Sequence, residues 1–302
     1  MTAKVEWGLR GVIVPLITPF KNDLSVDFAG VAKLVDYYIE EVGCDGLVPC
    51  GTTGESATLS HREHADVIEA VVRQTRRRVP VIASAGSNAT KEAVELTRLA
   101  AELGADATLQ VCPYYNKPTQ AGLFNHFAAI AEASKLPLIV YNIPGRTGRN
   151  IEPKTIVRMW EEIPSVVGLK DCSCDIHQTM EIYRGTDPET FKIYSGEDIM
   201  TLSLLAHGAA GAIAAVAHVI GAEVKQMCAA MWSGRIQDAR DIHYRIMDVV
   251  DALFVEPNPT PVKQAVEWLG LPAGPLRPPL ERLTPAGQEI LRAAMVAGGW
   301  LT

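Results

Sequence analysis

The sequence lacks several features that would place it in a specialised class of proteins. It has no excess of positive charge, because 28 lysines and arginines stand against 35 aspartates and glutamates and give a net charge of −7. We therefore expect no surface for nucleic acid. Residues 1–10 mix charges and hold no apolar core, so we expect no secretory signal and a cytoplasmic location. No low-complexity run or obvious linker divides the chain.

Two common cofactor patterns are also missing. No G-x-G-x-x-G follows any strand-like run, so the sequence gives no support for a dinucleotide site. The six cysteines form no paired C-x-x-C sets, which makes a structural zinc site unexpected. Cys172 and Cys174 are close enough for a redox or metal pair, but reduced thiols are the favoured interpretation. The cysteines are Cys44, Cys50, Cys112, Cys172, Cys174 and Cys228.

Only one hydrophobic run is long enough to raise the question of a membrane span. Residues 202–222 are nearly all apolar and reach the length that crosses a bilayer. The run also contains His207, His218 and several glycines. We therefore predict the end of one helix, a buried strand and the start of the next helix, and no membrane partner.

Strand-like and helix-like segments alternate along residues 1–233. A hydrophobic fraction of 48% and a charged fraction of 21% are those of an ordinary globular protein. Eight strand–helix units of this length predict an α/β fold, a (β/α)8 TIM barrel, in preference to an open doubly wound sheet. The expected strands are 11–20, 45–50, 80–85, 106–112, 137–142, 166–171, 191–195 and 210–216. The expected helices are 27–42, 60–75, 90–103, 120–133, 153–160, 176–184, 198–206 and 220–232.

The remaining residues, 234–302, have helical patterns without further strands. Residues 234–254 and 261–269 are amphipathic, and Thr284-Pro285 is typical of a helix start. We predict a C-terminal helical appendage that packs on a barrel domain of residues 1–233.

The apolar run of residues 166–169 leads directly into Lys170. A short run of this kind predicts a buried strand. Burial lowers the pKa of an amine and leaves part of it neutral and nucleophilic. Such an amine condenses with a ketone to give a Schiff base. Taken alone, a strand-end lysine that reaches solvent is the simpler interpretation of Lys170, and the other strand ends decide between the two.

Those other strand ends carry polar groups suited to the same chemistry. Active sites of such barrels form where the strands end. The turn at 51–55 (Gly-Thr-Thr-Gly-Glu) offers N–H groups and hydroxyls to a small carboxylate. Tyrosines at 114, 115 and 141 suit proton transfer, and Arg146 suits a second carboxylate. A tight turn and wall-packing aromatics explain each feature singly, but their joint occurrence favours a site.

The motifs at these strand ends resemble those of the dihydrodipicolinate synthase family. The family belongs to the class I aldolase superfamily that includes N-acetylneuraminate lyase. The resemblance covers nearly the whole chain and extends to the run at 254–263. The motifs are Gly51-Thr52-Thr53-Gly54-Glu55-Ser56, Pro113-Tyr114-Tyr115-Asn116-Lys117-Pro118, Tyr141-Asn142-Ile143-Pro144-Gly145-Arg146-Thr147 and Gly168-Leu169-Lys170-Asp171.

The resemblance implies a Schiff-base synthase that condenses pyruvate with L-aspartate 4-semialdehyde on the route to lysine and diaminopimelate. The enamine attacks the aldehyde, and the chain cyclises with loss of water. No metal or organic cofactor is implied, and a homotetramer built as a dimer of dimers is expected. The implied roles are the Schiff base for Lys170, proton transfer for Tyr141, a relay through Thr52 to Tyr115 of a neighbouring subunit, pyruvate binding for Thr53 and the backbone of Ile213, and binding of the aldehyde's carboxylate for Arg146.

Some residues depart from the family pattern. The eighth-strand run at 213–218 (Ile-Ala-Ala-Val-Ala-His) stands where the family usually shows Ile-Ser-Val-Thr-Ala-Asn, and Cys172-Ser173-Cys174 follows the lysine where small residues are usual. Gly145 replaces a common serine or proline. Two alternatives therefore stay open. One is a related pyruvate-dependent aldolase that splits a sugar acid or hydroxy-oxo acid, and the other is a catalytically silent small-molecule-binding homologue.

The resemblance also implies an allosteric pocket for L-lysine at a dimer interface. Glu92 suits an ammonium group, and Tyr114 is the neighbour of the relay residue Tyr115. His61 and His64 lie one turn apart on one helix face, where surface residues or a weak zinc pair are the simpler interpretations. The pocket positions are Ser56, Ala57, His61, His64, Asn88, Glu92 and Tyr114.

Overall fold

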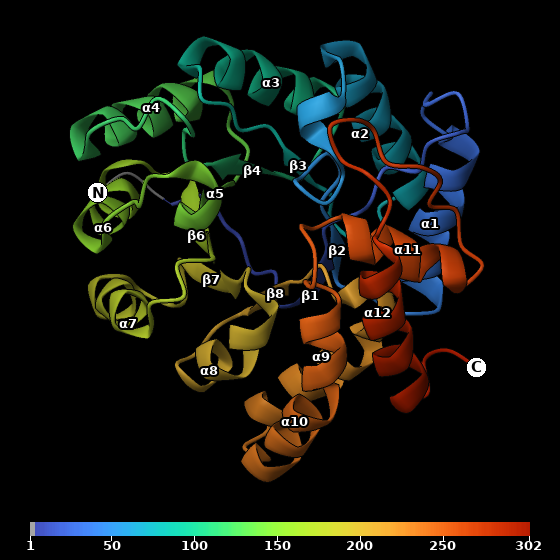
Figure 1. Cartoon of the computed structure of the whole chain (residues 1–302). Helices are drawn as coiled ribbons and strands as arrows, with labels where there is room; N and C mark the ends of the chain where they lie inside the picture. The colour runs from blue at the N-terminus through green and yellow to red at the C-terminus, as the bar shows by residue number, and fades with distance from the viewer. Residues whose placement is uncertain (1–3) are drawn as a thin grey trace. The chain divides into compact units, whose positions relative to one another are not determined.

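A computed structural model describes residues 4–302 (Figure 1). The chain falls into two compact units. The first unit comprises Ile82–Ile213 together with the residues up to Arg10. The second unit comprises Gly11–Val81 and Ala214–Thr302. The predicted division into 1–233 and 234–302 stays a prediction.

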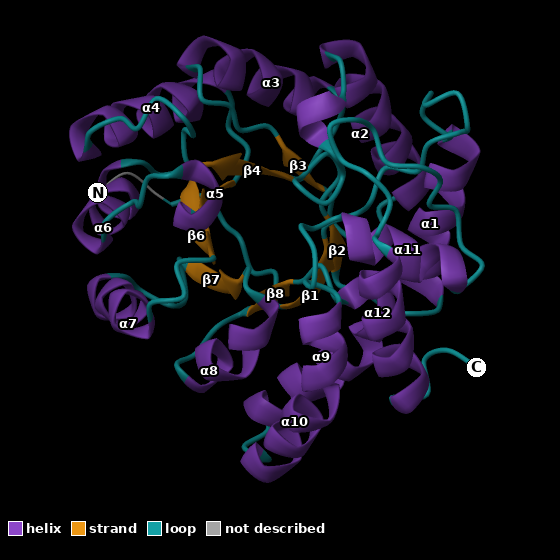
Figure 2. Cartoon of the chain, viewed as in Figure 1, coloured by secondary structure: helices purple, strands orange, loops and turns teal. Residues whose placement is uncertain are grey.

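The first unit is a run of parallel strands in which helical segments connect each strand to the next (Figure 2). Successive strands pair with each other, from β3 to β8. The strands are β3 Ile82–Ser84, β4 Ala107–Val111, β5 Leu138–Asn142, β6 Val166–Asp171, β7 Lys192–Ser195 and β8 Gly211–Ile213. The helices are α3 Thr90–Glu102, α4 Gln120–Ala133, α5 Pro144–Thr147, α6 Pro153–Glu162, α7 Ile176–Gly185 and α8 Thr201–Ala206, with a 3-10 turn, η2, at Asp198–Met200.

The core of the first unit lies between these helices and the strands. Phe127 of α4 and Met159 of α6 are fully buried beside Val140 and Leu169 of the sheet. Apolar residues on one stripe of each helix meet the outward-facing residues of the strands, which fixes the strands as a rigid frame. Polar side chains that follow the strands are therefore held on a stable base.

The second unit combines the first strands with the C-terminal helices. β1 pairs with β2 in parallel, and the amide of Ala214 donates to the carbonyl of Ile13 at 3.0 Å. Helix α10 packs against α9 and α12. The elements are β1 Gly11–Val14, α1 Phe28–Glu40, β2 Gly46–Leu47, the 3-10 turn η1 Ser56–Thr58, α2 His61–Thr75, α9 Ala217–Trp232, α10 Ile236–Ala252, α11 Thr260–Trp268 and α12 Pro285–Ala297.

The strand order identifies the fold class. The eight strands follow the order β2-β1-β8-β7-β6-β5-β4-β3, and a parallel bridge between Leu47 and Val81 joins β2 to the residue before β3. Eight parallel strands that alternate with helices form a (β/α)8 barrel. The predicted fold, with C-terminal helices α10 to α12, is confirmed.

Several predicted bounds are confirmed and others are wrong. The capping box of Ser60 and Glu63 opens α2, which ends at Thr75 as predicted. The first two strands were predicted too long: β1 ends at Val14, before Pro15, and β2 ends at Leu47. Cys50 cannot extend β2, because its φ of 56° lies in the left-handed region.

The apolar run of residues 202–222 has the structure that the sequence predicts. It contains the end of α8, all of β8 and the start of α9. Among residues 4–302, none of the helices combines the length and the apolar character that a membrane crossing requires.

Candidate active site

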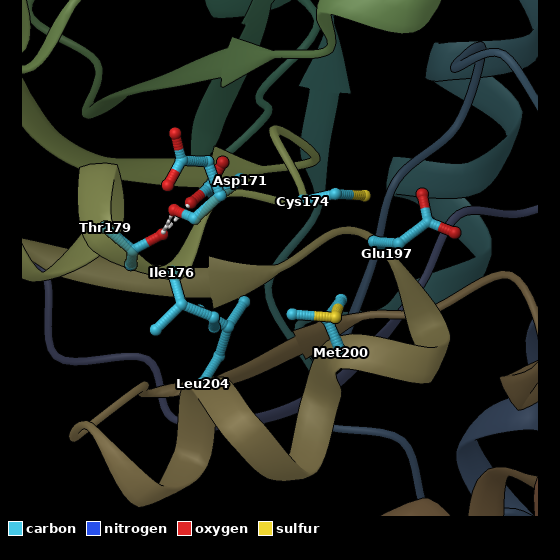
Figure 3. Close-up of a pocket in the computed structure, with 8 residues that line it drawn as sticks. Asp171, Cys174, Ile176, Thr179, Glu197, Met200 and Leu204 are labelled. Atoms are coloured by element: carbon cyan, nitrogen blue, oxygen red, sulfur yellow. Dashed lines mark hydrogen bonds between the residues drawn. The ribbon is translucent and has the colours of Figure 1, made fainter.

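Lys170 lies one residue before the end of β6 and is 7% exposed. Side chains alternate along a strand, so Lys170 and Cys172 share one face while Asp171 takes the other. The Asp171 carboxylate accepts a hydrogen bond from the Thr179 hydroxyl of α7 (Figure 3). It also accepts one from the Ser173 amide. The contact with α7 anchors the strand end that carries the lysine.

Tyr141 is the neighbour of Lys170 on the adjacent strand. The two residues are directly paired in the β5–β6 ladder, and the Lys170 nitrogen lies 4.4 Å from the centre of the Tyr141 ring. Both side chains are buried. This arrangement brings the predicted nucleophile and the predicted proton carrier together.

The surroundings of Lys170 set the charge of its amine. Burial lowers the pKa of Lys170 below its ordinary value. Cys172 and the carboxylates of Asp198 and Glu197 oppose that effect, whereas the positive charge of Arg146 adds to it. The result is an amine with a larger neutral fraction than a surface lysine has at the same pH, which Schiff-base formation requires.

Cys172 is a residue whose role the sequence left open, and the structure places it against the reacting groups. Its thiol is hydrogen-bonded to the side chain of Tyr141. Burial raises the pKa of the Cys172 thiol to about 12, so it is a protonated thiol near neutral pH. A protonated thiol is a poor nucleophile, and Cys172 therefore acts here by packing and hydrogen bonding.

Gly196, which follows β7, makes room for these two side chains. A Cβ at this position would lie 2.5 Å from the Cys172 sulfur and 2.7 Å from Cε of Lys170. Both distances are shorter than non-bonded atoms tolerate. Any side chain at 196 would therefore displace the lysine.

Glu197 and Arg146 are two charged residues outside the strands that act on the charge of Lys170. Glu197 is half-buried, and the loss of hydration raises the pKa of its carboxyl group against the opposing charges of Lys170 and Arg146. Arg146 lies on α5 and is exposed. Figure 3 shows Glu197 extending away from Asp171 at the edge of a small pocket in the first unit. The pocket is lined by Asp171, Cys174, Asp175, Ile176, Thr179, Glu197, Met200 and Leu204.

Tyr115 stands apart from this group. It is 90% exposed with a φ of 71°, and its amide donates to the carbonyl of Thr147 at 3.4 Å. Its ring therefore makes little contact with the described chain. Ile213, in contrast, is fully buried at the end of β8.

The turn with Thr52 and Thr53 belongs to the second unit. The amides of Gly54 and Ser56 donate to the carbonyl of Gly51, and Thr53 is buried while Thr52 is half-buried. A Cβ on Gly54 would lie 2.9 Å from the Leu16 carbonyl oxygen, so the turn requires glycine there. These internal bonds match a tight turn, the simpler of the two interpretations of this motif. That the turn offers N–H groups and hydroxyls to a small carboxylate stays a prediction.

The residues of the predicted lysine pocket fall into two groups. In the first unit, the Asn88 amide donates to the Tyr114 carbonyl at 3.2 Å, and the Ser87 hydroxyl donates to the Glu92 carboxylate. In the second unit, Ser56 and Ala57 form η1, and α2 carries an exposed His61 and a buried His64. The structure thus joins Asn88 to Tyr114 and gives Glu92 a serine partner that the sequence did not reveal.

A buried lysine with a depressed pKa, on the sixth strand of a (β/α)8 barrel and against a tyrosine, defines an enzyme of the Schiff-base, class I aldolase type. The sequence matches the Dihydrodipicolinate synthetase family over residues 8–297. The chain belongs to this family.

Individual relatives match this chain along nearly their whole length. The chain is 48% identical to a 4-hydroxy-tetrahydrodipicolinate synthase of Nitratidesulfovibrio vulgaris, with 96% of this chain and 98% of the relative covered. Among solved structures, it is 43% identical to a lysine-bound synthase from Cyanidioschyzon merolae, with a TM-score of 0.95 and coverage of 98% and 100%. It is 41% identical to a chloride-inhibited Acinetobacter baumannii synthase complexed with pyruvate, with a TM-score of 0.93 and coverage of 97% and 100%. The predicted family and synthase activity are confirmed.

Proposed function

We propose that the protein condenses pyruvate with L-aspartate 4-semialdehyde, and that Lys170 forms the Schiff base. The observation that carries this proposal is the buried Lys170 amine, 4.4 Å from the centre of the Tyr141 ring and with a lowered pKa. Synthases similar over their full length, one of them complexed with pyruvate, support it.

The chemistry follows from the groups around the lysine. The neutral amine of Lys170 adds to the ketone of pyruvate, and the carbinolamine loses water to give an imine. Loss of a C3 proton gives an enamine, which attacks the aldehyde carbon. The amino group of the second substrate then displaces Lys170 from the imine carbon and closes the ring, so one water is lost overall. We assign proton transfer in these steps to Tyr141, relayed through Thr52 to Tyr115.

The remaining site residues bind the two substrates in this proposal. Thr53 and the backbone at Ile213 hold pyruvate. Arg146 binds the carboxylate of the semialdehyde, because a guanidinium offers two parallel hydrogen bonds to such a group. Its exposure and its electrostatic effect on Lys170 support this assignment.

We further infer that L-lysine inhibits the enzyme at Ser56, Ala57, His61, His64, Asn88, Glu92 and Tyr114. The bond between Asn88 and the Tyr114 carbonyl and the lysine-bound relative support a pocket that includes this loop. The 90% exposed ring of Tyr115 supports a homotetramer in which a neighbouring subunit covers it. Sedimentation of the purified protein distinguishes a tetramer from a dimer or a monomer.

A coupled assay with pyruvate and aspartate semialdehyde tests the proposed reaction. We expect turnover with this pair, and little or no cleavage of sugar-acid or hydroxy-oxo-acid aldols offered in parallel. Faster cleavage of one of those aldols would assign the protein to the related aldolases. No turnover of any of them, with a folded protein, would favour a silent binding homologue.

A further inference from the structure

The C-terminal part of the second unit makes three polar contacts, two of them fully buried, to the turn at residues 51–55. Asn258 contacts Thr53, Lys263 contacts Glu55, and the backbone of Arg277 contacts Glu55. These residues lie more than two hundred positions away from the turn in the sequence. Burying a polar group costs free energy unless the group finds a hydrogen-bond partner. The partners of these buried groups therefore show which parts of the turn are held in place.

The contact between Asn258 and Thr53 leaves the threonine hydroxyl free to act as a hydrogen-bond donor. The Asn258 side-chain amide donates to the Thr53 hydroxyl oxygen at 3.0 Å, and both residues are buried. A hydroxyl has a single hydrogen, and an oxygen that already accepts a bond keeps that hydrogen for another partner. Thr53 is therefore set as a donor, which is the role that an anionic substrate requires.

The ion pair of Lys263 and Glu55 is fully enclosed and fully hydrogen-bonded. The charged atoms are 2.7 Å apart, and the side chains are 2% and 0% exposed. The ammonium group uses its other two donors on the carbonyls of Thr18 and Pro275, and the second oxygen of Glu55 accepts from the Arg277 amide. A buried pair with all its bonds made specifies one geometry for the segment that carries it.

The same pair reaches the backbone of the turn through Thr18. The Thr18 hydroxyl donates to the Gly54 carbonyl at 2.7 Å, and its own carbonyl accepts from Lys263. Glu55 itself has a φ of 55°, a left-handed conformation that non-glycine residues adopt only when their surroundings hold them there. Lys263 is thus connected to the turn twice, directly through Glu55 and indirectly through Thr18, which bonds to Gly54.

Arg277 connects these contacts to the start of α2. Its guanidinium donates to the carbonyls of Leu24 and Thr58 and to the carboxylate of Glu63, which closes the α2 capping box. The Lys263 and Arg277 cations both lie over the ring of Phe20, at 4.5 and 4.3 Å from its centre. In Figure 1 the segment between α11 and α12, in orange and red, runs beside the start of α2.

We propose that Asn258 and Lys263 are positioning residues for pyruvate binding. Asn258 fixes the Thr53 hydroxyl as a donor to the pyruvate carboxylate, and the Lys263–Glu55 pair holds the turn backbone in place. This inference rests on the proposed function, in which Thr53 binds pyruvate.

A double-mutant cycle on Asn258 and Thr53 tests the first part. The readout is the pyruvate concentration that gives half-maximal borohydride trapping on Lys170, which needs no second substrate. We expect Asn258→Ala and Thr53→Val each to raise this concentration about tenfold, the size of one lost hydrogen bond to a charged group. Because Asn258 acts through Thr53, the double variant should be no weaker than Thr53→Val alone.

The cycle separates the possible failures. If the effect of Asn258→Ala is as large in the Thr53→Val background as in the wild type, Asn258 does not act through Thr53 and the inference is wrong. If Thr53→Val leaves trapping unchanged, Thr53 does not bind pyruvate and the inference also falls, while the Schiff base stands. If the wild type traps no pyruvate at all, the proposed function itself fails.

Lys263 is tested by comparing the Michaelis constants for the two substrates. In Lys263→Met we expect the constant for pyruvate to rise about tenfold, as for one lost charged hydrogen bond. The constant for the semialdehyde should change less than twofold. The matched control is Lys225→Met, which removes the partly exposed Lys225–Asp45 pair and should leave both constants unchanged. Equal rises for both substrates would reduce Lys263 to a structural role.

Glu55→Gln keeps the test of Lys263 decisive if Lys263→Met does not fold. This variant removes the negative charge and keeps the shape of the side chain, so it loosens the same pair from the other side. We expect the same selective rise in the constant for pyruvate. An unchanged constant would contradict the role given to the pair.

Discussion

The Lys170 nitrogen lies 4.4 Å from the centre of the Tyr141 ring, and the two residues are paired across β5 and β6. The ladder fixes the heights of the two side chains, so their proximity does not depend on a flexible loop. The ring covers the amine and contributes to the burial that lowers the pKa of Lys170. The side chain of the same tyrosine is hydrogen-bonded to Cys172, which restrains its position next to Lys170.

Tyr141→Phe separates the ring of this tyrosine from its hydroxyl. The phenyl ring still covers Lys170, but the group that carries protons is lost. General acid–base catalysis is typically worth a factor of about 10²–10⁴, and we expect kcat to fall by that amount. Steady-state turnover with both substrates measures it, with circular dichroism to verify the fold. A loss of less than about threefold would show that another group moves the proton.

Arg146→Ala tests the site of the second substrate. We expect the Michaelis constant for the semialdehyde to rise far more than that for pyruvate, because a bidentate carboxylate contact is lost. Arg158→Ala is a suitable control, since Arg158 is likewise an exposed arginine but pairs with Glu162 on α6. Equal rises for the two substrates would assign Arg146 to structure instead of substrate binding.

The sequence predicted the element types well because apolar periodicity and caps act locally. Helix α4 and strand β6 have the predicted bounds, Gln120–Ala133 and Val166–Asp171. The one missed helix, α5, has only four residues and is too short to show a period. The ends of β1, β2 and β8 were placed too late, because apolar residues continue past the point where the ladder stops.

The sequence predicted only part of the site, because a local pattern does not show which distant residues meet. Lys170, Tyr141 and Arg146 lie at or just past the ends of β5 and β6, where the polar residues of the sequence predict a site. The glycine and glutamate that follow β7 give no such signal on their own. Gly196 and Glu197 lie there and contact or face the lysine. The bond from Asn258 to Thr53 joins residues 205 positions apart, and no local pattern in the sequence indicates it.

Cysteine alkylation tests the state of the thiol beside Lys170. Burial raises the pKa of Cys172 to about 12 and also raises that of the exposed Cys174, by less. The reactive thiolate is present only near or above the pKa, so at pH 7.5 we expect iodoacetamide to label Cys174 first. Peptide mass spectrometry over time measures both rates. Labelling of Cys172 as fast as Cys174 would contradict a buried, protonated thiol.

Calorimetry with L-lysine tests the regulatory pocket. We expect binding to the wild type, weaker binding to Glu92→Ala and His64→Ala, and nearly unchanged uninhibited turnover in both. Allosteric coupling is typically about 1–3 kcal/mol, which corresponds to a change in affinity of roughly 5- to 150-fold. Glu95→Ala removes a neighbouring exposed carboxylate of α3 and serves as the control. No heat of binding at millimolar lysine would refute the pocket.

Borohydride trapping tests the central claim, that Lys170 forms a Schiff base with pyruvate. Reduction converts an imine to a stable amine, so pyruvate and borohydride should leave a covalent adduct on the wild-type protein. Peptide mass spectrometry should locate that adduct on Lys170, and Lys170→Ala and Lys170→Arg should give none. An adduct on another lysine, or an undiminished adduct in Lys170→Ala, would contradict the account.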